Sequence, residues 1–243
     1  MKKVTLFVLV FCTSFSGLKA QDKSFQKGDI TVGLGIGVAI YGTKIHEEYN
    51  SQIWNGSGIS TVRIANDTTD GAASTIIPVS VEYGLSNWFG LGARFGYSKY
   101  FANADSTNNN IKPTVRGLDL DLVLNFHLVK TKRFDMPISL IVGYSNFNYK
   151  ANNPNSNPTP LPDNGNSMAK DNGLNYGIAL VPRIYFGSHV GMFFNVGYMG
   201  YNYGSITFSN NSDSNLNDDN NQDRNFKIKG NGFNIGIGLI GKF

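Results

Sequence analysis

The chain of 243 residues has a single cysteine, Cys12, and beyond its first residues no run that approaches eighteen apolar residues. One cysteine excludes an internal disulfide framework, and the missing apolar run excludes a transmembrane helix. Charged residues make up only 16% of the chain, and few segments repeat their apolar residues at a helical period. What remains is rich in Gly, Asn, Tyr and Phe.

Residues 1–20 have the features of a secretory signal that is removed on export. Lys2 and Lys3 are followed by an apolar stretch and then by the small-residue cleavage site that ends at Ala20. Cys12 would be lost with this segment, and the bulky Phe11 before it fits a lipoprotein site poorly. Loss of Lys2, Lys3 and Lys19 lowers the net charge from +4 to +1, so we expect no nucleic-acid partner.

Eight stretches place apolar residues at every second position. In the closing stretch NGFNIGIGLIGKF, Phe233, Ile235 and Ile237 alternate with polar residues and glycines. A period of two predicts a strand with one apolar face and one small or polar face. The eight predicted strands are 29–42, 77–85, 89–100, 117–128, 136–144, 174–186, 192–198 and 231–243.

The connections between these strands alternate between short and long. The short ones cover 86–88, 129–134 and 187–190, whereas the long ones, rich in Asn, Ser, Asp, Pro and Gly, cover about 42–75, 101–113, 150–173 and 204–225. This alternation is typical of an antiparallel meander with one plain end and one elaborate end. A soluble barrel and an outer-membrane barrel both fit such a meander.

The composition of the two strand faces favours the membrane. The non-apolar face carries many glycines, which coat a soluble surface poorly but make room inside a narrow eight-stranded lumen. The apolar face carries aromatic residues near strand ends, as in interfacial girdles. Residues 233–243 would rise roughly 25 Å at a tilt of about 45°, which matches the apolar band. The sequence therefore predicts an all-β fold, an eight-stranded antiparallel up-and-down transmembrane β-barrel whose final strand pairs with its first.

The chain resembles the small eight-stranded outer-membrane barrels of the OmpA and OmpX type. In that family the last strand alternates apolar residues and ends in an aromatic residue, which the barrel-assembly machinery reads as an insertion signal. Ile235, Ile237, Leu239 and Phe243 match this pattern, whereas Gly241 departs from it. The resemblance implies a monomer in the cell outer membrane, in contact with membrane lipid and lipopolysaccharide, with the assembly machinery as a further partner.

The expected organisation follows from this resemblance. Residues 21–27 form a short periplasmic tether, and residues 28–243 form the barrel, with no further domain expected after Phe243. The chain ends and short turns face the periplasm, and the four long loops face outward.

Inward-facing charges are the sharpest feature of the predicted lumen: Glu82, Arg94, Asp119, Asp121 and Arg183. Counted from the short turns, Arg94 lies level with Asp121, and Glu82 lies within diagonal reach of that pair. One interpretation is a salt-bridge gate in a narrow pore, and the other is a packing network that closes the lumen. Bulky inward residues favour packing, namely Ile141, Tyr185, Phe193, Met199 and Tyr201.

The histidines do not suggest an active site. His127 faces inward near a short turn, and His189 lies within a short turn. His46 lies in the first long loop beside Glu47 and Glu48, without a serine partner. We therefore expect no catalytic residue and no cofactor.

Two of the predicted loops contain features of a candidate site. The fourth loop spaces Asp213, Asn215 and Asn217 as in a calcium loop, but Asp218 and Arg224 replace the required Gly and Glu, so no metal site is expected. In the first loop, SQIWNGSGISTVRI has turn signals between apolar residues, which suggests a hairpin above the membrane. Trp54 there is either a packing residue or an exposed anchor.

Three functions follow, in order of preference. The first is a non-enzymatic protein with a structural or surface-binding role, whose loops bind an unknown extracellular ligand. The second is a narrow gated pore for ions or very small solutes. The third is a lipid-modifying enzyme.

Overall fold

The computed structural model describes residues 23–54, 56–101, 112–152, 167–210 and 225–243. The predicted signal, residues 1–20, lies outside the described residues. The described residues form nine strands: β1 (Ile30–Trp54), β2 (Ile59–Gly84), β3 (Phe89–Phe101), β4 (Lys112–Lys130), β5 (Phe134–Asn152), β6 (Ser167–Leu180), β7 (Arg183–Tyr185), β8 (Val190–Asn210) and β9 (Asn225–Lys242).

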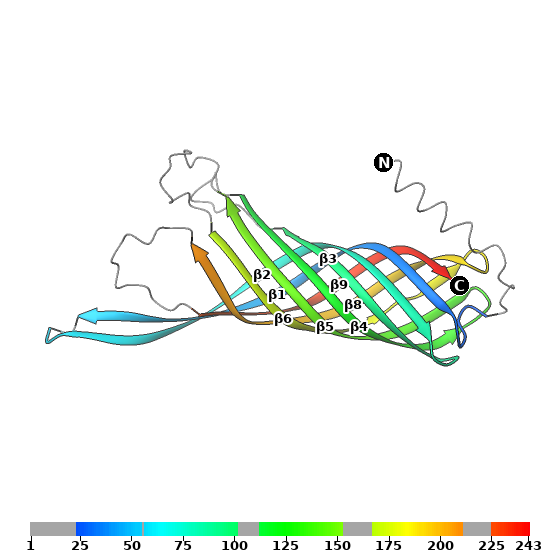
Figure 1. Cartoon of the computed structure of the whole chain (residues 1–243), viewed down its shortest axis with the longest axis horizontal. Helices are drawn as coiled ribbons and strands as arrows, with labels where there is room; N and C mark the ends of the chain where they lie inside the picture. Colours follow the sequence, from blue (N-terminus) through cyan, green and yellow to red (C-terminus); the bar gives the residue numbers. More distant parts are fainter. Residues whose placement is uncertain (1–22, 55, 102–111, 153–166, 211–224) are drawn as a thin grey trace.

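The strands close into one antiparallel barrel (Figure 1). β1 pairs with β2 on one side and with β9 on the other, from Thr31 opposite Lys242 to Glu48 opposite Asn225. β6 and β7 both lie between β5 and β8, so they form one barrel strand that is interrupted at Val181 and Pro182. Proline has no N–H to donate to a ladder, which explains the interruption. The predicted eight-stranded up-and-down barrel is confirmed.

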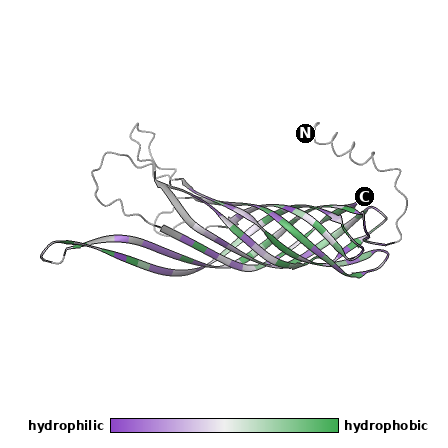
Figure 2. Ribbon diagram, turned by 60° about the horizontal axis from the view of Figure 1, so that its bottom comes forward, coloured by the Kyte–Doolittle hydropathy of each residue, from purple (hydrophilic) through white to green (hydrophobic). Residues whose placement is uncertain are grey.

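The apolar face of the strands points outward, as predicted. Ile40, Phe233 and Leu239 expose 71%, 69% and 65% of their surface, although they lie in the middle of paired strands. Figure 2 shows the hydrophobic residues distributed along the barrel strands. The bulky residues predicted to fill the lumen are buried: Ile141, Tyr185, Phe193, Met199 and Tyr201. Among the described residues, no helix is long and apolar enough to cross a membrane.

The long connections are shorter than predicted, because strands extend into them. β1 and β2 continue as a paired ladder through most of 42–75, up to Trp54 opposite Ile59. Likewise β5 continues to Asn152 and β8 to Asn210. Polar residues at these positions hide the apolar alternation on which the prediction depended. The other predicted loops fall largely outside the described residues, at 102–111, 153–166 and 211–224.

The segment predicted as a short tether, residues 21–27, is packed against the barrel from Ser24 onward. Ser24 and Phe25 are buried, and Gly28 and Asp29 pair with Gly84 through N–H to C=O bonds of 2.8 Å each. We call residues 24–29 the strap. It lies at the short-turn end of the barrel, where the termini of the strands meet the connections 85–88, 131–133 and 186–189.

Candidate functional site

The lumen holds two separate charge clusters, and the first centres on Arg94. Arg94 and Asp121 are directly opposed on β3 and β4, and the Arg94 Nε donates to Asp121 Oδ2 at 2.7 Å. Asn175 on β6 donates to the other Asp121 oxygen at 2.7 Å. Asp119 accepts from Ser145 at 2.5 Å and from Tyr201 at 3.1 Å. We call Arg94, Asp119 and Asp121, with these partners, the Arg94 cluster.

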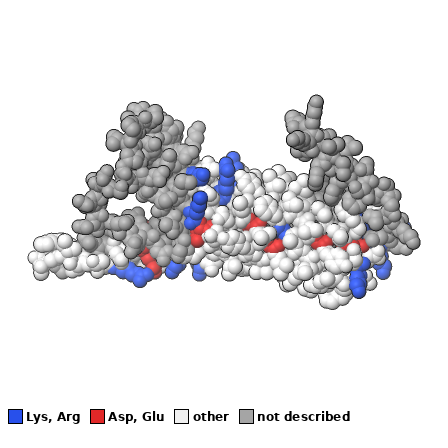
Figure 3. All heavy atoms as spheres, viewed as in Figure 1, with Lys and Arg blue, Asp and Glu red and all other residues white. Residues whose placement is uncertain are grey.

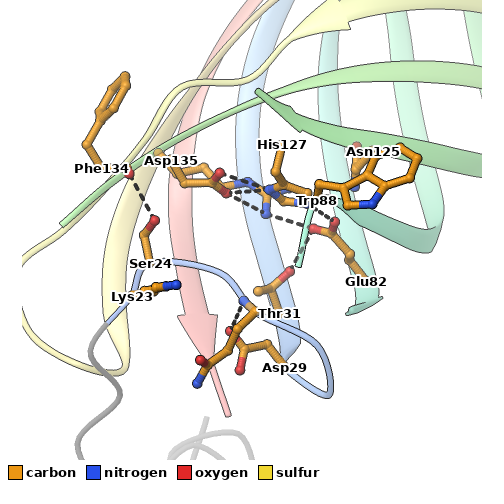
Figure 4. A network of polar contacts seen from close by, with 12 residues as sticks. Lys23, Ser24, Asp29, Thr31, Glu82, Trp88, Asn125, His127, Phe134 and Asp135 are labelled. Carbon is orange, nitrogen blue, oxygen red and sulfur yellow. Dashed lines mark hydrogen bonds and ion pairs between the residues drawn. The ribbon is translucent and has the colours of Figure 1, made fainter. Parts of the chain in front are cut away.

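Glu82 does not join this cluster, so its predicted diagonal contact with Arg94 and Asp121 is wrong. It accepts instead from His127 Nε2 at 2.8 Å and lies 2.7 Å from the Arg183 guanidinium, on the far side of the lumen. The Nδ1 of His127 lies 2.9 Å from both carboxylate oxygens of Asp135, which is fully buried (Figure 4). We call Glu82, His127, Asp135 and Arg183 the His127 cluster.

The His127 cluster sets two carboxylates against a guanidinium and an imidazole, all with less than a tenth of their surface exposed. Buried charges are tolerated when opposite charges and hydrogen bonds satisfy them. The sequence pattern does not point to Asp135, which lies one residue beyond the predicted connection 129–134. It also predicts no partner for His127, whereas Glu82 on β2, Asp135 on β5 and Phe25 of the strap all contact its ring.

The strap covers the His127 cluster at the short-turn end. The Ser24 hydroxyl donates to the Phe134 carbonyl at 2.9 Å (Figure 4). The Ser24 N–H donates to the Thr131 carbonyl at 3.1 Å. Phe25, fully buried, stacks on the His127 ring. The ammonium group of Lys242 donates to the Lys23 carbonyl at 2.7 Å. The strap therefore closes this mouth of the lumen.

A ring of five aromatic side chains closes the other side of the Arg94 cluster: Tyr41, Tyr100, Phe147, Tyr203 and Tyr201. Each ring contacts the next, with centroids between 5.5 Å (Tyr41 and Tyr201) and 6.4 Å (Tyr100 and Phe147) apart. The circle closes from Tyr201 back to Tyr41, and such contacts are favourable at these separations. Between the two closures lies a cavity of about 100 Å³, lined by members of both clusters, including Glu82, Arg94 and Arg183.

The β1–β2 ladder continues beyond the barrel at the long-loop end. We call residues 43–54 and 56–70 the hairpin extension. Figure 1 shows it, in cyan, projecting past the other described strands. Within the described chain, β9 pairs with β1 only as far as Glu48, and β3 pairs with β2 only as far as Ala73. The outer part is therefore a two-stranded ribbon, which is marginally stable without further contacts.

An ionic cluster joins the two strands of the hairpin extension. His46 Nδ1 lies 2.5 Å from Asp67, and His46 Nε2 lies 3.1 Å from Glu48, which also accepts from Arg63. The bond with Asp67, and then the bond with Glu48, raises the pKa of His46. The bonds from His46 and Arg63 lower the pKa of Glu48 to about 2. Both ring nitrogens of His46 are therefore held by carboxylates, so its role in this structure is to join the two strands.

The tip of the hairpin extension is apolar on both faces. Trp54 and Ile59 oppose each other on the face of the ionic cluster, and they are 71% and 67% exposed. Ile53 and Val62 lie on the other face and are also exposed. The exposed Trp54 fits the anchor interpretation of the sequence rather than the packing interpretation.

The remaining candidate residues stand apart from these clusters. His189 contacts Ser188 at 2.6 Å in a short connection. Ile235, Ile237 and Leu239 point outward from β9, while the Phe243 backbone pairs with Ile30. Their role as an insertion signal stays a prediction. The calcium-like segment 213–224 lies outside the described residues, and no group of three His, Cys, Asp or Glu residues among those described is arranged to hold a metal.

Comparison with known proteins gives matches at the level of structure. No family model and no curated protein matches the chain. OprG from Pseudomonas aeruginosa, an outer membrane protein, is 14% identical over 90% of this chain and 97% of its own, with a TM-score of 0.52. The outer membrane protein AlkL, determined in DMPC bilayers, is 16% identical over 94% of this chain and 96% of its own, with a TM-score of 0.48.

At such low identity the likeness to OprG concerns the fold. The closed sheet leaves no unpaired barrel edge, and its outer face is apolar, as lipid requires. The chain therefore has the fold of the small outer-membrane β-barrel proteins and is an integral barrel of that membrane.

Proposed function

We propose that this chain is a non-enzymatic, surface-binding protein, in which a closed barrel holds the hairpin extension outside the cell. The observation that carries the proposal is the apolar tip formed by Ile53, Trp54, Ile59 and Val62. Exposed apolar clusters on a polar support are typical of interaction sites, and Trp is frequent among residues that dominate binding energy. The proposed orientation sets the long-loop end outward.

The closure of the lumen supports a binding role over a conducting role. The strap with Phe25 closes one mouth and the aromatic ring closes the other, on either side of two ion-paired charge clusters. A rigid closed barrel suits a protein that presents a projecting element. The ionic cluster of His46, Glu48, Asp67 and Arg63 fixes the strands of that element against each other.

Adhesion of cells tests this function. In a strain lacking the chain, we would compare cells producing the wild type, a variant with Trp54→Ser and Ile59→Ser, and a control with Thr69→Ser at the hairpin base. Settling of suspensions and retention on protein-coated glass measure binding. We expect the tip variant to fall to the level of cells without the chain, and the control to match the wild type. Equal adhesion of all three would contradict the proposal.

The alternative is a gated pore, which the cavity of about 100 Å³ between the clusters favours. Single-channel conductance of the refolded protein in a planar bilayer separates the two functions. We expect a closed baseline both for the wild type and for Arg94→Ala, because the strap and the aromatic ring remain in both. Discrete openings that Arg94→Ala alters would instead identify the Arg94 cluster as a gate.

A further inference from the structure

A row of basic residues crosses four neighbouring strands at the long-loop end. Lys99 on β3 is directly opposite Arg116 on β4, and Arg116 is opposite Asn148 on β5. Asn148 is in turn opposite Lys170 on β6. Lys150 lies two residues along β5, on the same face. We call Lys99, Arg116, Lys150 and Lys170 the cationic patch.

The side chains of the patch point away from the lumen and are exposed. They continue the outward alternation of apolar residues on the same strands, such as Phe95, Leu118, Tyr144 and Leu174. None of the four makes a hydrogen bond or an ion pair through its side chain with the described part of the chain. The nearby outward positions on these strands carry neutral residues: Thr114, Asn146, Asn148 and Asn172.

The opposition of Lys99 and Arg116 is unfavourable by itself. Directly opposed like charges destabilise a pair of antiparallel strands. At Arg94 and Asp121, and at His46 and Asp67, the opposed residues carry opposite charges instead. A second pair of opposed like charges, Lys44 and Lys229, joins β1 and β9. An anion between Lys99 and Arg116 would remove the repulsion. A guanidinium suits a phosphate, because its planar N–H groups bind two oxygens at once.

The height of the patch on the barrel indicates the source of the anion. Two residues closer to the short-turn end, Tyr97 and Leu118 form an opposed pair at the edge of the apolar belt. Lipid headgroups lie immediately outside the hydrocarbon layer, so the patch lies at their level. Figure 3 shows Lys and Arg side chains gathered near this end of the barrel, at the base of the hairpin extension.

We propose that the cationic patch binds the phosphate groups of an anionic lipid in the outer leaflet. Lys99 and Arg116 share one phosphate, and Lys150 and Lys170 bind a second. Three strand spacings separate Lys99 from Lys170, a width of about 14 Å, which suits a headgroup with two phosphates. The choice of leaflet rests on the orientation in the proposed function, whereas the preference for phosphate does not.

Lipid retention tests the proposal. The refolded mature protein in zwitterionic detergent would be mixed with bisphosphorylated lipid A or with its dephosphorylated form, and bound lipid counted by native mass spectrometry. The test variant is Lys99→Gln with Arg116→Gln. The control is Lys132→Gln with Arg133→Gln, two exposed residues at the short-turn end. We expect the test variant to bind the bisphosphorylated lipid at least tenfold more weakly than the wild type and the control.

Thermal melting supplies a second measurement and a check of folding. Without lipid, we expect the test variant to melt no lower than the wild type, because the like-charge repulsion is gone. The bisphosphorylated lipid should raise the melting temperature of the wild type and of the control more than that of the test variant. Equal retention by both variants, or equal retention of the dephosphorylated lipid, would overturn the proposal. An equal rise with inorganic phosphate alone would identify a free ion, not a lipid, as the ligand.

Discussion

Phe25 lies flat against His127, with ring centroids 3.4 Å apart and an angle of 9° between the rings. Phe25 is fully buried, and the ring beneath it is held between the carboxylates of Glu82 and Asp135. The strap is therefore a packed part of the barrel, in contact with the charge cluster that closes the lumen.

Replacing Phe25 with Ala should release the strap. Loss of a buried aromatic side chain removes about 2 kcal/mol or more of docking free energy, a change of more than tenfold in the fraction released. We expect trypsin to cleave after Lys27 at least tenfold faster than in the wild type, followed by mass spectrometry. Phe186→Ala, which changes an exposed aromatic residue at the same end, is the control. An unchanged cleavage rate in Phe25→Ala would show that hydrogen bonds alone hold the strap.

Replacing Arg94 with Met should destabilise the barrel strongly. Asp121 is fully buried and would keep only the neutral Asn175 as a partner. Breaking a buried ion pair from one side costs about 3–5 kcal/mol. The double variant Arg94→Met, Asp121→Asn should lose less than the sum of the single variants, because it leaves no unpaired charge. Urea unfolding in detergent measures each free energy, and additive losses would argue against a coupled pair.

The hairpin extension should be most ordered between about pH 4.5 and 6.5, the ordinary pKa values of Glu and His. The raised pKa of His46 gives a contribution that is complete below its ordinary value and is lost as the pH rises through the raised value. The lowered pKa of Glu48 gives a contribution that is present above its ordinary value and is lost as the pH falls through about 2. NMR relaxation of the hairpin amides against pH measures this order. His46→Gln should abolish the loss at high pH and reduce the loss at low pH to the part that Arg63 supplies, because the bond from His46 is the first cause of the lowered pKa of Glu48.

Replacing Gly143 with Ala should disturb the Arg94 cluster. An added Cβ would lie 2.7 Å from the Asn175 Oδ1 and closer still to the Asp121 Oδ1. Overpacking of this kind costs about 1–3 kcal/mol. Gly71→Ala is the matched control, because its added Cβ would meet no atom within 4 Å. Equal free energies of unfolding for the two variants would show that the cluster shifts without cost.

The sequence predicts the barrel well because every membrane-spanning strand must turn an apolar side chain to the lipid at each second position. Alternation along 231–243 predicts a strand with an outward apolar face, and the need to close the sheet predicts its pairing with β1. Adjacent pairs such as Arg94 and Asp121 follow from counting along neighbouring strands. The contact of Glu82 with Arg183 does not, because it joins β2 and β7 across the lumen, and the stagger of the whole barrel decides such contacts.

The strap and the hairpin extension show little in the sequence that would predict their structure. The strap has one aromatic residue among polar neighbours, so nothing in its pattern separates it from a flexible tether. The hairpin extension alternates polar residues, such as His46, Glu48 and Asp67, and its pairing comes from hydrogen bonds and charges rather than from an apolar face. Periodicity of hydrophobic residues cannot detect a strand that buries no hydrophobic face.

The surface that receives the strap comes from distant parts of the sequence. It includes Gly84 at the end of β2, Thr131 and Phe134 around the β4–β5 turn, and Lys242 on β9. This surface is complete only after β9 has paired with β1. Residues 24–29 precede every strand along the chain, yet their full set of contacts, from Gly84 to Lys242, exists only in the closed barrel. A fully docked strap therefore distinguishes a finished barrel from an open sheet.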